Sequence, residues 1–184
     1  MIVRPSPLLC ELHAHTTWSD GALTIRELVD LYGRSGFDVL AVTDHTVRDA
    51  RHVCAGIWPR YHDAIEAERE RAARLYGLLL IAGIELTYDD ADPLRAAHAV
   101  ALGLHKFVGV EAGLDQALAA ARGHGAALIA AHPNHPDDIG AAHGRTARFA
   151  AEWRELRGAV DRFERARGVL RQHFGKAAGG LFRR

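Results

Sequence analysis

The sequence predicts a single α/β domain built on a parallel sheet. Apolar runs and amphipathic helical patterns alternate along nearly the whole chain of 184 residues, as expected for right-handed βαβ units. The run Leu78–Ile84 is continuously apolar, which is typical of a strand covered on both faces. There is no internal repeat and no low-complexity linker. One domain over residues 1–184 is therefore the simplest organisation, with the sheet either open or closed as a barrel.

Helix signals separate the expected strands. Thr24 and Glu27 form a capping box that begins the first helix, and Gly36 ends it. Pro59 lies in the first turn of the second helix, and Gly77 ends that helix. The predicted helices cover residues 24–36, 59–76, 110–124 and 152–157. The predicted strands cover residues 8–12, 39–43, 78–84, 98–104, 127–131 and, more weakly, 159–163.

Composition narrows the class of protein. Hydrophobic residues make up 48% of the chain, yet no apolar run approaches the roughly 18 residues of a membrane helix. The start of the chain does not resemble a signal peptide, and two cysteines give no disulfide framework and no thiolate metal site. We therefore expect the protein to be located in the cytoplasm and to have no contact with a membrane. Residues 145–184 hold eleven Lys/Arg against four Asp/Glu, so the rest of the chain is acidic and suits a cation better than a nucleic acid.

Metal-type side chains recur where the predicted strands end. His13 and His15 follow the first strand at positions i and i+2, so that their imidazoles can share a face. His45, Glu85 and His132 end the second, third and fifth strands. Ligands of α/β sheets and barrels bind at this edge, although two nearby histidines alone are more often structural. Asp20 and His98 are of the same residue types. The candidate metal ligands are therefore His13, His15, Asp20, His45, Glu85, His98 and His132.

These ligands exceed one tetrahedral zinc site and suit two or three divalent metals that share a carboxylate. Glu85 is the candidate bridge, and Mn, Zn and Fe all accept such ligands. Glu85, Asp20 and His45 are the candidate catalytic residues, because close metals activate water and orient a phosphate. Asp44 either orients an imidazole or caps a turn. Arg48 either contacts the phosphate or is an ordinary surface arginine.

The ordered motifs resemble those of the PHP (polymerase and histidinol phosphatase) superfamily over roughly residues 8–170. The motifs are His13-Ala14-His15 with Asp20-Gly21, Thr43-Asp44-His45, Gly83-Ile84-Glu85, His98 in a strand, and Ala131-His132-Pro133. The chain is most similar to the small stand-alone metal-dependent phosphoesterases. The resemblance implies a distorted seven-stranded (β/α) barrel with two or three metals. It also implies hydrolysis of a small phosphate monoester or nucleotide by a hydroxide that bridges the metals.

One family motif is missing. A Ser-Asp-x-His segment follows the late strand that ends in Glu in the family, but no Asp-x-His follows Glu164 in this sequence. We therefore expect a barrel without its last strand and helix, and a disordered basic tail over residues 171–184. Two alternatives stay open. One is a catalytically impaired remnant that binds metal or a phosphorylated ligand, and the other is an exonuclease on single-stranded nucleic acid. The sequence does not indicate the oligomeric state.

Overall fold

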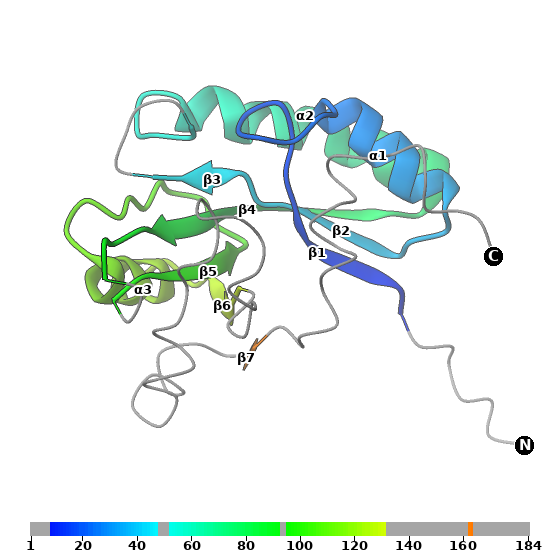
Figure 1. Ribbon diagram of the computed structural model, residues 1–184. Helices are drawn as coiled ribbons and strands as arrows, with labels where there is room; N and C mark the ends of the chain where they lie inside the picture. The colour runs from blue at the N-terminus through cyan, green and yellow to red at the C-terminus, as the bar shows by residue number, and fades with distance from the viewer. Residues whose placement is uncertain (1–7, 48–51, 93–94, 132–161, 164–184) are drawn as a thin grey trace, which may run out of the picture.

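In the part of the chain that the structure describes, a curled seven-stranded sheet with three helices packed on it forms the fold (Figure 1). This is a computed structural model, and it describes residues 8–47, 52–92 and 95–131 together with the backbone of residues 162–163. The helices are α1 (Ile25–Arg34), α2 (Trp58–Tyr76) and α3 (Leu114–Gly123). The strands are β1 (Cys10–Ala14), β2 (Val39–Val42), β3 (His45–Thr46), β4 (Leu79–Tyr88), β5 (Ala97–Leu102), β6 (Ala127–Ala130) and β7 (Arg162–Phe163).

The strand order is β1-β2-β4-β5-β6-β7, with β3 paired to the second half of β4. The α/β class and the curled, barrel-like sheet are confirmed, but the prediction of a wholly parallel sheet is wrong at β5. This strand is antiparallel to both β4 and β6, whereas the other described pairs are parallel. The link over residues 89–96 is shorter than the dozen or so residues of a parallel crossover, so the chain turns back on itself. The start of β5 therefore lies at the edge where its neighbours end.

Most element boundaries agree with the sequence patterns. Thr24 and Glu27 form the predicted capping box, and Gly77 ends α2 with φ 65°. The β3 strand was not predicted, and β4 continues to Tyr88, so Glu85 lies inside a strand rather than at its end. Helix α3 begins later than predicted, after Gly113 with φ 102°. The predicted helix 152–157 lies outside the described residues, and the weak strand 159–163 is described only where residues 162–163 pair with β6.

The two faces of the sheet have different partners. Successive side chains of a strand point to opposite faces. On β4, Leu80, Ile84 and Leu86 join the large core that packs against the helices. Ile81 instead joins a small cluster on the other face, with Ala41, Val100, Leu102 and Ala131. Gly83, Glu85 and Thr87 share the face of Ile81 by the same alternation, so the concave face carries the polar side chains of β4.

A polar network links α1 to α2. Arg71 contacts Asp30 at 2.6 Å, and the Tyr76 hydroxyl donates to the same carboxylate at 2.9 Å. Burial disfavours the ionised form of Asp30, but the hydrogen bonds from Arg71 and Tyr76 outweigh it and hold its pKa below the ordinary value. Gly33 packs directly on the Tyr76 ring. Within the described residues, no helix is long and apolar enough to cross a membrane.

Candidate metal centre

Glu85 is the centre of a histidine cluster on the concave face. Its side chain is 1% exposed. The Oε2 atom lies 2.9 Å from His45 Nδ1, 3.1 Å from His13 Nε2 and 3.4 Å from His15 Nε2. The Oε1 atom lies 3.1 Å from His98 Nδ1. The two oxygens of one buried carboxylate therefore face different sets of imidazoles.

Asp20 adds a second carboxylate on the solvent side of the cluster. Its Oδ1 atom lies 3.3 Å from His15 Nδ1 and 3.6 Å from His45 Nε2. The rings of these two histidines are 4.3 Å apart, and each faces Glu85 with one nitrogen and Asp20 with the other. The Asp20 side chain is 39% exposed, so the open side of the cluster is here.

The donor atoms fit divalent metals in both chemistry and spacing. Two ligands on one ion, each about 2.0–2.2 Å from it, lie roughly 3.0–3.5 Å apart. The observed N···O separations of 2.9 to 3.6 Å cover this range. Among the described residues, two groups of three have donor atoms within 4.8 Å of one another, namely His13, His15 and Glu85, and His15, Asp20 and His45. Imidazole and carboxylate without thiolate suit Mn, Fe or Zn.

His98 lies between two carboxylates. Its Nδ1 faces Glu85, and its Nε2 lies 3.1 Å from Asp89 Oδ1. Burial alone would lower the pKa of His98, but the hydrogen bonds to Asp89 and Glu85 prevail and raise it to about 9. The hydrogen bond from His98 in turn lowers the pKa of Asp89. The sequence reasoning missed Asp89, because an acidic residue in a turn resembles any surface acid.

Asp44 orders the loop that carries His15 and Asp20. It is fully buried, and it accepts hydrogen bonds from the Thr16 amide at 2.7 Å, the Thr16 hydroxyl at 2.8 Å and the Ser19 hydroxyl at 2.6 Å. Burial raises the pKa of Asp44, and these hydrogen bonds oppose the rise. Ser19 Oγ lies 3.5 Å from His15 Nδ1. Asp44 therefore holds the Thr16–Ser19 loop in place and reaches the His15 imidazole through Ser19.

Gly21 permits the same loop to fold tightly. A Cβ atom at this position would lie 2.3 Å from the His15 carbonyl oxygen and 2.6 Å from the Thr16 nitrogen. Both are backbone atoms of the loop, and the Gly21 amide donates to the Thr16 carbonyl at 2.9 Å. The Asp20-Gly21 pair therefore has a steric reason, because Asp20 reaches His15 only across this turn.

Comparison with known proteins identifies the family of this chain. A model of the PHP domain family matches residues 11–136. The chain belongs to the PHP family. This PHP chain is also 47% identical over 36 residues to the DNA polymerase/3'-5' exonuclease PolX of Bacillus subtilis. The match covers 20% of the chain and only 6% of that protein.

Solved structures share the fold of this PHP domain. A two-domain protein of Bacteroides vulgatus that contains a predicted PHP-like metal-dependent phosphoesterase has a TM-score of 0.59 and 24% identity, over 85% of this chain and 43% of that one. A proposed metal-dependent phosphoesterase of Bifidobacterium adolescentis has a TM-score of 0.52 and 16% identity, over 88% and 78%. An amidohydrolase of Chromobacterium violaceum with bound sulfate and no metal has a TM-score of 0.57 and 17% identity, over 84% and 75%.

Two predicted site residues of the PHP chain, His132 and Arg48, lie outside the described residues.

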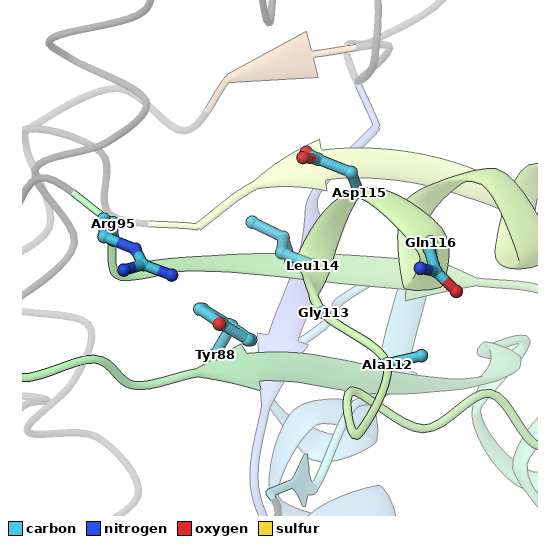
Figure 2. Close-up of a pocket in the computed structure, with 7 residues that line it drawn as sticks. All are labelled: Tyr88, Arg95, Ala112, Gly113, Leu114, Asp115 and Gln116. Atoms are coloured by element: carbon cyan, nitrogen blue, oxygen red, sulfur yellow. The ribbon is translucent and has the colours of Figure 1, made fainter.

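A separate cavity of about 350 Å³ lies between the end of β4 and the start of α3 (Figure 2). Figure 2 shows Tyr88 and Arg95 opposite Leu114 at its wall. Tyr88 points to the helix-covered face by strand alternation, so this cavity is not part of the histidine cluster.

Tyr61 was also missed, although it supports two elements of the centre. Its buried hydroxyl donates to the Gly83 carbonyl at 3.0 Å and accepts from the Asp44 amide at 3.1 Å. These residues lie just before Glu85 and His45. Tyr61 lies within the helix predicted over residues 59–76, and nothing in its spacing signals the polar contacts.

Proposed function

We propose that this PHP chain is a metal-dependent hydrolase of phosphate esters that acts on a small phosphate monoester or nucleotide. The observation that carries the proposal is the placement of Glu85, whose two oxygens face different imidazoles at 2.9 to 3.4 Å. A carboxylate in this position is suited to join two metal sites. The proposed ligands are His13, His15, Asp20, His45, Glu85 and His98, together with His132 from the motif.

Electrostatics favour a phosphate ester over a neutral amide. With neutral imidazoles, Glu85, Asp20 and Asp89 contribute three negative charges, so two or three divalent ions leave the site positive. A positive site in a partly buried pocket attracts a phosphate dianion far more strongly than an uncharged substrate. This charge balance supports the phosphoesterase names of two structural relatives over the amidohydrolase name of the third.

Different residues of this chain have different proposed roles at the site. Divalent ions at such a site supply an activated water and neutralise charge on the phosphate. Buried Glu85 keeps the imidazoles in one arrangement, and the Thr87 hydroxyl lies 2.7 Å from His45 Nδ1 and limits rotation of that ring. Asp20, on the open side, is placed where a substrate would enter. Arg48 is the proposed contact for a phosphate oxygen.

The test is turnover by the full chain after chelation and reloading with Mn²⁺, Zn²⁺ or Fe²⁺. We expect hydrolysis of p-nitrophenyl phosphate or a nucleoside monophosphate, and a loss of more than about 100-fold in Glu85→Gln. His124→Gln is the control, because it removes an exposed imidazole at the end of α3. Metal-loaded protein that hydrolyses no ester would reject the proposal and favour the impaired, metal-binding alternative.

A nuclease on single-stranded nucleic acid is the second candidate. The local similarity to PolX and the eleven basic residues in 145–184 favour it. End-labelled single-stranded DNA and RNA, incubated under conditions that cleave the small ester, separate the two candidates.

The cytoplasm is the proposed location, since Cys10 and Cys54 are both free thiols.

A further inference from the structure

We propose that Asp89 is a positioning residue that sets which nitrogen of His98 is presented to Glu85 and the metal centre. The inference rests on the proposed function, because it concerns the same centre. It assigns a role to a residue outside the motifs and outside the predicted ligand set.

The contacts of His98 carry the inference. The imidazole is 7% exposed and spans two carboxylates, with Nδ1 3.1 Å from Glu85 Oε1 and Nε2 3.1 Å from Asp89 Oδ1. In the metal-free chain both nitrogens of His98 face carboxylates, whereas an imidazole that binds a metal is neutral, with one N–H donor and one lone pair. Because Asp89 holds Nε2–H, the proton that a metal would displace is the one on Nδ1, and the lone pair would then face the Glu85 oxygen. Histidine ligands commonly need such a partner on the other nitrogen to fix their tautomer.

The β4–β5 hairpin creates this arrangement. His98 pairs directly with Thr87 in the antiparallel register. Glu85 and Thr87 share the concave face by strand alternation, and Asp89, just past the end of β4, contacts the same imidazole. Diagonal neighbours of this kind are within reach of a long side chain across an antiparallel pair. The register therefore places His98 between one carboxylate inside the strand and one just beyond its end.

The two carboxylates differ in exposure. The Glu85 side chain is 1% exposed and the Asp89 side chain is 66% exposed. Replacing Asp89 by asparagine consequently leaves no unpaired buried charge, and the variant should fold. Asp90→Asn is the matched control, because it removes the same charge from the same turn. Asp90 accepts from the Asp92 amide at 2.9 Å and pairs with Arg95 at 3.6 Å.

The experiment compares wild type, Asp89→Asn and Asp90→Asn by two measurements. The first is NMR of ¹⁵N-labelled, metal-free protein, in which the Nε2–H proton of His98 is identified by its loss in His98→Gln. We expect a slowly exchanging signal in wild type and Asp90→Asn and a signal that exchanges faster or is lost in Asp89→Asn, because an amide oxygen accepts more weakly than a carboxylate. The second is calorimetric titration with Mn²⁺ and Zn²⁺. We expect Asp89→Asn to bind the more weakly held ion about 10-fold less tightly, and Asp90→Asn to bind like wild type.

Titration in the His98→Gln background completes the test. If Asp89 acts through His98, then Asp89→Asn causes no further loss of affinity there. A loss of equal size in both backgrounds would make Asp89 a ligand in its own right and overturn the inference. An unchanged NMR signal, or equal affinities of Asp89→Asn and Asp90→Asn, would also overturn it while leaving the proposed function intact. Wild-type protein that binds neither ion, but shows the NMR change, would reject the proposed function and the positioning role together.

Discussion

Removal of one hydroxyl, in Tyr61→Phe, should destabilise the chain and weaken the metal centre together. The side chain of Tyr61 is fully buried, and its hydroxyl both donates to Gly83 and accepts from Asp44. The substitution leaves two buried backbone groups without this partner. At about 1–2 kcal/mol for each group left in the interior, we expect a loss of roughly 2–4 kcal/mol in the free energy of unfolding.

Tyr76→Phe is the matched control, because it removes a hydroxyl from the same helix. That hydroxyl donates one hydrogen bond to the partly exposed Asp30, so its loss should cost only about 0.5–1.5 kcal/mol. Urea unfolding followed by circular dichroism measures both. With a slope near 2 kcal/mol per M, the midpoint of Tyr61→Phe should fall by about 1–2 M.

The affinity for Mn²⁺ provides a second measurement. Tyr61→Phe should lower it, because Asp44 and Gly83 directly support the segments that carry His45 and Glu85. Tyr76→Phe should leave it unchanged. A Tyr61→Phe protein no less stable than Tyr76→Phe would refute the assignment of both hydrogen bonds, and normal metal affinity in a destabilised protein would refute the link to the centre.

Three further outcomes are expected. Gly21→Ala should reduce metal affinity by more than about 10-fold in calorimetry, because its Cβ would collide with the His15 backbone, whereas Gly123→Ala, with no atom within 4 Å of the new Cβ, should be neutral or slightly stabilising. Because the pKa of Asp30 is lower in the folded chain than its ordinary value of 3.8, its stabilising contribution is present above about pH 4 and is lost as the pH falls through the folded pKa. Asp30→Asn should therefore be less stable than wild type at pH 7, and this difference should shrink as the pH falls below about 4 in urea titrations; a constant difference would contradict this. Metal at about 100 times its Kd should add roughly 2.7 kcal/mol and raise the Tm by about 5–10 °C, and a chelator should reverse the shift. An unchanged Tm would count against ordered metal sites.

The elements with strong periodic or capping signals were predicted well. The Thr24–Glu27 box locates the start of α1, and Gly77 locates the end of α2. Strand direction could not be obtained in this way, because an apolar run has the same pattern when read toward either edge of a sheet. The reversal of β5 was therefore missed, and so was the physical reason that His98, at the start of its strand, reaches the other histidines.

The candidate ligands were foreseen better than the groups that support them. His13, His15, His45 and Glu85 belong to recognisable short motifs, and the structure brings all four together. The contact of Asp89 depends on the β4–β5 register, which sequence patterns do not specify. The two residues of β3 are too few to show any periodicity. Supporting groups of this kind are recognised by geometry rather than by residue type.

The reversed β5 strand also divides assembly of the centre into a local and a long-range part. Glu85 and His98 are 13 residues apart in one hairpin, so their contact closes a short loop. His13 lies in β1 and His15 directly follows it; β2 separates β1 from the hairpin in the sheet, and α1 and α2 separate them in sequence. Short loops close at a lower entropic cost and earlier in folding than long ones. Glu85 and His98 can therefore come together before the rest of the chain has folded. An ion bound to them at that stage would act as a template for docking of the N-terminal strand.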